Sequence, residues 1–157
     1  MRRSDDKRWR FMYGSCSMSV LGGATLLLLQ LGCSGSNPYD LVNVSGKVTY
    51  EDGSLIPAKS IMLKFNPEVA AIDTKTHPRK GFALVNVSDG TFEYATTHTH
   101  ADGLVAGKHK VLIVAYGEEG KSAKVVPPEY LRPDTTPVEI DTENASLEIK
   151  VKKPKGA

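Results

Sequence analysis

The sequence predicts an all-β fold, a β-sandwich of about seven strands that follows an apolar N-terminal segment. From residue 41 onward, apolar and polar side chains alternate with a period of two, as they do in half-buried strands. Asp-Gly pairs punctuate these stretches, and no window of about twelve residues there shows the 3.6-residue period of a helix. With 157 residues, of which 40% are hydrophobic, the chain suffices for one domain but not for two with a linker.

The N-terminal segment has the charge pattern of an export signal. Residues 1–10 hold five basic side chains against Asp5 and Asp6, and a mostly apolar run follows at 20–31. A helix of that run would reach about 18 Å, which is short of the roughly 30 Å hydrocarbon core of a bilayer. We therefore expect residues 1–32 to be a signal peptide.

The apolar run ends in a short motif that resembles a bacterial lipobox, Leu29-Gln30-Leu31-Gly32-Cys33. The resemblance implies that the thiol of Cys33 takes a diacylglycerol and that cleavage before it makes this cysteine the new N-terminus. The protein would then be held in the cell envelope, facing outside the cytoplasm. Gln30 and Leu31 depart from the usual pattern, so two alternatives stay open: cleavage elsewhere, or an uncleaved anchor over residues 11–33.

Cysteine usage and charge agree with removal of this segment. Cys16 lies within residues 1–32, so Cys33 would be the single cysteine of the processed chain, and the flexible tether would run over 33–41. The formal charge of +2 would become −1, because the segment holds five of the 20 basic and two of the 18 acidic side chains. Neither value gives an electrostatic reason to expect nucleic-acid binding.

The predicted strands follow in chain order. Alternating stretches run over 42–50, 60–65 and 147–152, with a shorter one at Phe92 and Tyr94, and residues 82–87 are the weakest of the set. Residues 110–116 are apolar on both faces, which predicts a central strand covered on both sides. Residues 126–133 contain three prolines and permit at most one turn of helix. We expect the sandwich to occupy 42–153 and a short tail 154–157.

The turns between these strands have a common chemistry. Asp52-Gly53, Asp89-Gly90 and Asp102-Gly103 are each a pair that supplies the positive φ angles of a tight turn, and each is expected to mark a chain reversal. These three carboxylates could build a calcium site only if their loops met, and calcium requires six or more oxygens. Turn formation alone explains them.

Several of these stretches resemble the transthyretin-like and carboxypeptidase regulatory-like domains. The resemblance rests on residues 44–57 followed by 61–65, on Asp89-Gly-Thr-Phe92, on 106–114, and on the proline- and tyrosine-containing segment 126–137. It implies a prealbumin or immunoglobulin-like sandwich that acts as a non-enzymatic accessory or binding module. His109 stands where that family usually has an aromatic residue, so we expect its imidazole to replace a core ring.

The remaining candidate chemistry centres on histidine. His98 and His100, spaced by two with Asp102 nearby, could supply three metal ligands, although a polar loop before a turn explains them as well. A small hydrolase is a weaker alternative, because no Gly-x-Ser-x-Gly motif occurs. Residues 152–157 also do not match the Tyr-Arg-Gly-Ser ending of the transthyretin-like hydrolases.

Together these features predict a lipid-anchored envelope protein without enzymatic activity or cofactor. Its partners would be the membrane, through the lipid on Cys33, and an envelope protein or polysaccharide of unspecified identity. Lys75, His77, Arg79 and Lys80 form a cationic stretch, which exposure to solvent explains without a partner.

Overall fold

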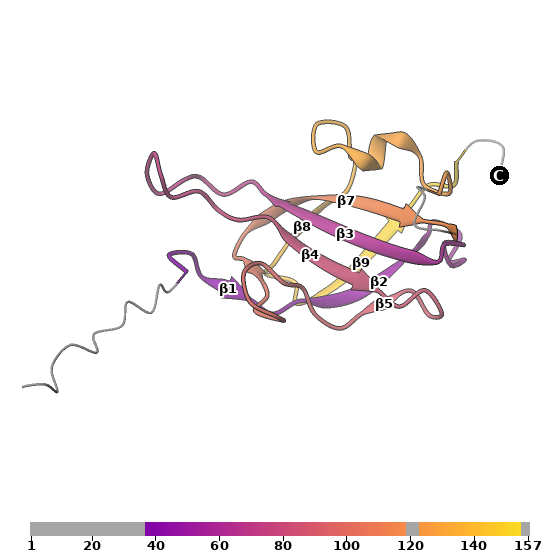
Figure 1. Ribbon diagram of the computed structural model, residues 1–157, viewed down its shortest axis with the longest axis horizontal. Helices are drawn as coiled ribbons and strands as arrows, with labels where there is room; N and C mark the ends of the chain where they lie inside the picture. Colours follow the sequence, from indigo (N-terminus) through magenta and orange to yellow (C-terminus); the bar gives the residue numbers. More distant parts are fainter. Residues whose placement is uncertain (1–36, 119–122, 155–157) are drawn as a thin grey trace, which may run out of the picture. The chain divides into compact units, whose positions relative to one another are not determined.

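The computed structural model describes residues 37–118 and 123–154, which fold as an all-β sandwich (Figure 1). The strands are β1 Leu41–Val42, β2 Ser45–Tyr50, β3 Ser60–Pro67, β4 Gly81–Val85, β5 Thr91–Phe92, β6 Leu104–Val105, β7 Lys108–Tyr116, β8 Glu139–Asp141 and β9 Ser146–Val151. One sheet has the order β4-β3-β7-β8 and the other the order β5-β2-β9, while β1 and β6 form a separate two-stranded ladder. The predicted fold class is confirmed.

The long strands lie where the alternation predicts them, and the short ones do not. β3, β4, β7 and β9 match the predicted stretches to within a few residues. The stretch 42–50 is divided at Asn43 and Val44, so its first part pairs with β6 and its second part with β5 and β9. The strand expected at Phe92 and Tyr94 is shorter than predicted: it ends at Phe92, and Tyr94 is exposed. β6 and β8, of two and three residues, were not predicted.

The core lies between the two sheets and is formed by the inward-facing residues of each long strand. β9 alternates exposed and buried residues along its whole length, as the sequence predicts. It runs parallel to β2, with Gly46 opposite Leu147 and Val48 opposite Ile149. The largest fully buried side chains are Tyr130, Phe65, Leu63, Leu104, Ile113, Ile149 and His109.

The outer face of β7 differs from the prediction. β7 is central, between β3 and β8, but only one of its faces is buried, and Leu112 and Val114 on the other are half-buried. They line up across the sheet with outward-facing Met62, Phe82 and Leu84. Lys64 lies between Leu112 and Phe82 in this register, and Phe82 and Leu84 are exposed among the described residues, so the outer face is largely apolar but open to solvent.

The turn at 126–133 closes one side of the sandwich. The 3-10 helix η2, Pro128–Leu131, begins after Pro127 and is the single helical turn that the prolines allow. Its buried Tyr130 accepts a hydrogen bond at 3.0 Å from the amide of Lys152, just after β9. Among the described residues, no helix is long and apolar enough to cross a bilayer.

Candidate functional site

The predicted lipidation site, Cys33, lies outside the described residues, but the end of the predicted tether lies within them. The hydroxyl of Tyr39 donates to the carbonyl of Thr76 at 2.9 Å and accepts the amide of Ile72 at 3.1 Å. Both partners belong to the loop between β3 and β4, residues 68–80, called here the β3–β4 loop. Two residues later the chain enters β1, so the tether is bound to the domain from Tyr39 onward.

The three predicted metal ligands share one turn, and Asp102 organises it. The Asp102 carboxylate accepts hydrogen bonds from the backbone amides of Thr97, His98 and Thr99 at 2.7, 2.9 and 2.8 Å. Burial alone would raise the pKa of Asp102, but these three amides outweigh it and lower the pKa below its ordinary value. The carboxylate therefore bonds its own turn, which is the alternative role that the sequence allows.

The two histidines of this turn have separate partners. His98 Nδ1 accepts from the Arg79 guanidinium at 2.6 Å, which places a cation where a metal ion would be repelled. The ring of His100 instead packs edge-on against Tyr94, with centroids 4.7 Å apart. Within the part of the chain that the structure describes, no three or more His, Cys, Asp or Glu residues are grouped to hold a metal ion. His98, His100 and Asp102 are thus neighbours in sequence without forming a three-ligand cluster.

The other two turn carboxylates are engaged in the same way. Asp52 accepts from the amide and hydroxyl of Ser54 and pairs with Lys153 at 2.6 Å. Asp89 bonds the hydroxyl and amide of Thr91, which lower its pKa. The glycines after the three aspartates have φ of 82°, 79° and 93°, as the turn prediction requires.

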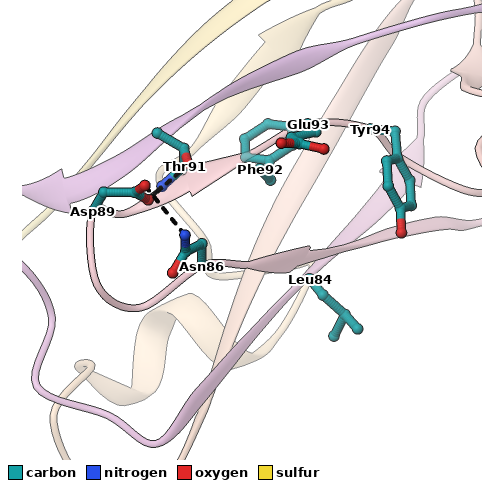
Figure 2. A pocket seen from close by; sticks show the side chains of 7 residues that line it. All are labelled: Leu84, Asn86, Asp89, Thr91, Phe92, Glu93 and Tyr94. Atoms are coloured by element: carbon teal, nitrogen blue, oxygen red, sulfur yellow. Dashed lines mark hydrogen bonds between the residues drawn. The ribbon is translucent and has the colours of Figure 1, made fainter.

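Asp89 also borders an open hollow of about 240 Å³ beside the turn that joins β4 and β5. Figure 2 shows its wall, in which Asn86 donates to Asp89 at 3.2 Å while Leu84 and Tyr94 lie farther along. The carboxylate of Glu93 is the other acidic group there. Since Asp89 is already bonded to Asn86 and Thr91, the hollow offers no pair of free acid and base groups.

His109 takes the core position that the sequence predicts for it. Its side chain is fully buried on the inner face of β7 and meets the Phe65 ring edge-on, with centroids 6.3 Å apart. Nε2–H donates to the Val105 carbonyl at 2.7 Å, whereas Nδ1 is buried without a partner among the described residues. Burial lowers the pKa of His109, and the Val105 bond and the charges of Asp141 and Glu68 offset this in part.

The β3–β4 loop is a feature that the strand pattern did not single out. It contains Ile72, whose side chain is 57% exposed, together with the cations Lys75, Arg79 and Lys80. The sequence feature that could have pointed to this loop is Ile72, which follows Ala70 and Ala71 and precedes a polar stretch. The bonds to Tyr39 could not be read from the sequence, because a tyrosine 33 residues before Ile72 has no local pattern.

Comparisons of the chain with protein-family models, with curated proteins and with solved structures find no significant match.

Proposed function

We propose that this protein is a lipid-anchored component of the cell envelope whose β-sandwich serves as a non-enzymatic binding or structural module. The observation that carries the proposal is the order of features at the N-terminus: a cationic start, a short apolar run, and Gly32-Cys33 eight residues before β1 begins. A folded unit that follows the cysteine after a short tether is the arrangement expected of a lipid-anchored domain. Acyl chains at about 0.8 kcal/mol per buried methylene would hold it at a membrane.

The non-enzymatic role is supported by the hydrogen bonds and the burial of the side chains that could act as acids, bases or nucleophiles. Asp52, Asp89 and Asp102 bond their own turns, and His109 is enclosed in the core. A general acid–base or nucleophilic mechanism needs such groups to converge on open space beside a substrate. Recognition would instead use surfaces such as the exposed Leu84 and Tyr94, facing an envelope protein or polysaccharide.

Metabolic labelling of the full chain with radioactive palmitate tests the anchor. We expect the native chain to be labelled and Cys33→Ala to lose the label, because the thiol is the acceptor. Cys16→Ala is the matched control, since Cys16 lies in the segment that processing removes, and it should keep the label. Equal labelling of the native and Cys33→Ala chains would contradict the proposal.

A further inference from the structure

We propose that the β3–β4 loop contacts the anionic lipid surface to which Cys33 is anchored, with Ile72 entering the headgroup region and Lys75, Arg79 and Lys80 facing lipid phosphates. The inference rests on the proposed lipid anchor and adds to it a membrane-facing side of the domain.

The length of the tether limits which part of the domain can reach the membrane. Six residue steps separate Cys33 from Tyr39, a distance of at most about 22 Å in a fully extended chain. Tyr39 is bound to the β3–β4 loop through Ile72 and Thr76. The chain therefore enters the domain beside this loop, and Figure 1 shows the loop and β1 at the same end of the sandwich.

The loop is held in a defined conformation. Asp73 accepts the amides of Lys75 and Thr76, both at 2.7 Å, and the Thr76 hydroxyl at 3.0 Å. These bonds, that from the Lys75 amide first, lower the pKa of Asp73. The Ile72 amide also donates to the Thr76 carbonyl at 3.0 Å. A loop that is already ordered loses less conformational freedom when it binds a surface.

The β3–β4 loop holds the cations Lys75, Arg79 and Lys80 against the acidic Glu68 and Asp73, and its three cations form no ion pair among the described residues. Six ion pairs occur within residues 37–118 and 123–154, and none of them includes Lys75, Arg79, Lys80 or the nearby Lys64. Arg79 donates to the ring atom Nδ1 of His98, a bond that does not neutralise the charge of the guanidinium. Lysine and arginine side chains in this state are attracted to anionic lipid phosphates.

Apolar groups accompany the cations. Ile72 is 57% exposed, and at the base of the loop Met62, Gly81 and Phe82 line an open hollow of about 290 Å³ flanked by Lys64 and Lys80. Exposed apolar side chains surrounded by lysine and arginine are typical of surfaces that lie at a bilayer interface. A purely polar ligand would leave Ile72 and this hollow unused.

The test uses residues 33–157, which contain every strand and the whole described core. Trp9, the one tryptophan of the chain, lies outside this fragment, and Cys33 is its one cysteine. Cys33 can therefore be coupled to a maleimide lipid in phosphatidylglycerol vesicles, and Ile72→Trp supplies a single fluorophore. We expect membrane attachment to shift the emission of this tryptophan to the blue and to protect it from acrylamide.

Leu55→Trp is the matched control. Leu55 is 39% exposed and lies between β2 and β3, at the opposite end of β3 from the loop. Its emission should not change on attachment. A blue shift at both positions, or at neither, would overturn the proposal.

Charge variants test the contribution of the cations. Without the lipid coupling, the combined change of Lys75, Arg79 and Lys80 to Gln should lower binding to the same vesicles about a hundredfold, at about fivefold per charge. The combined change of Lys47, Lys124 and Lys152 to Gln removes equal charge elsewhere and should have a much smaller effect. Equal losses would refute the loop as the contact. Palmitate labelling of Cys33 is measured separately, so these experiments can contradict the membrane contact of the loop without contradicting the lipid anchor.

Discussion

At the scale of single residues, the structure distinguishes groups that build the fold from groups that remain available. The resemblance to the transthyretin-like domains implies that His109 replaces a core ring, and His109 shares a strand face with Val111 and Ile113. The sequence also allows Asp102 to be either a ligand or a turn former, and only the positions of three backbone amides favour the second role. Residue spacing restricts which side chains are near one another, but the direction of a carboxylate depends on backbone geometry that spacing does not specify.

The buried imidazole of His109 should make stability depend on pH. Burial lowers its folded-state pKa below the unfolded value of 6.5. As the pH falls below 6.5 the unfolded chain takes up a proton that the folded chain resists, so the free energy of unfolding decreases by up to about 1.4 kcal/mol per pH unit. The decrease ends when the pH reaches the folded-state pKa.

Urea unfolding of residues 33–157 at a series of pH values measures this effect. His109→Phe should abolish the decrease just below pH 6.5, whereas His77→Gln, at an exposed loop position, should retain it. Asp89 and Asp102 affect the free energy of unfolding at a lower pH than His109. Because folding lowers the pKa values of both carboxylates, the stability that they contribute is lost as the pH falls below about 3.8. An unchanged slope in His109→Phe would show that another group is responsible.

At the scale of elements, the length of a strand determined whether the alternation of its residues could predict it. β3, β7 and β9 are six to nine residues long, enough for a period of two to be recognised. β6 and β8 are too short to show any period and exist because of their partners: Val105 is paired with Leu41, and His109 with Ile140. Such strands result from tertiary pairing, which local pattern does not contain.

The parallel contact between β2 and β9 provides a prediction at this scale. A Cβ on Gly46 would collide with the carbonyl of Leu147 and with the Phe92 ring. We expect Gly46→Ala to lower the free energy of unfolding by about 1–3 kcal/mol, because β9 and β5 must move apart to admit the methyl group. Ser45→Ala, at the exposed neighbouring position of the same strand, should change it by less than about 0.5 kcal/mol. Urea denaturation of both variants makes the comparison, and equal stabilities would show that the strands separate without cost.

At the scale of the whole molecule, the fold class was predictable and the surface was not. Periodicity and turn chemistry are local, and they were sufficient for an all-β sandwich. The candidate membrane surface depends on Tyr39 meeting Ile72 and Thr76, residues that are more than 30 positions away along the chain. The apolar outer face of β3, β4 and β7 also depends on which face of the sheet is left uncovered, and alternation alone does not determine that.

Residues 37–42 should act as a strap that stabilises one end of the sandwich without being needed for the rest. Tyr39 holds the β3–β4 loop, the Asp40 carbonyl accepts the Ala106 amide at 2.9 Å, and among the described strands β1 pairs with β6 alone. The core between the two larger sheets has its own contacts. Removal of the strap should therefore lower the free energy of unfolding by at least about 3 kcal/mol, at roughly 1 kcal/mol for each of the bonds Tyr39–Thr76, Ile72–Tyr39 and Asp40–Ala106, and loss of the β1–β6 ladder adds to this.

Hydrogen exchange of residues 37–157 and of residues 43–157 compares the domain with and without the strap. In the shorter chain the amides of Ile72 and Ala106 should exchange much faster, while those of β3 and β7 should change only as far as global stability does. Loss of protection throughout would mean that the strap is part of the cooperative core. Unchanged protection at Ile72 would mean that its bond to the Thr76 carbonyl is sufficient and that Tyr39 does not hold the loop.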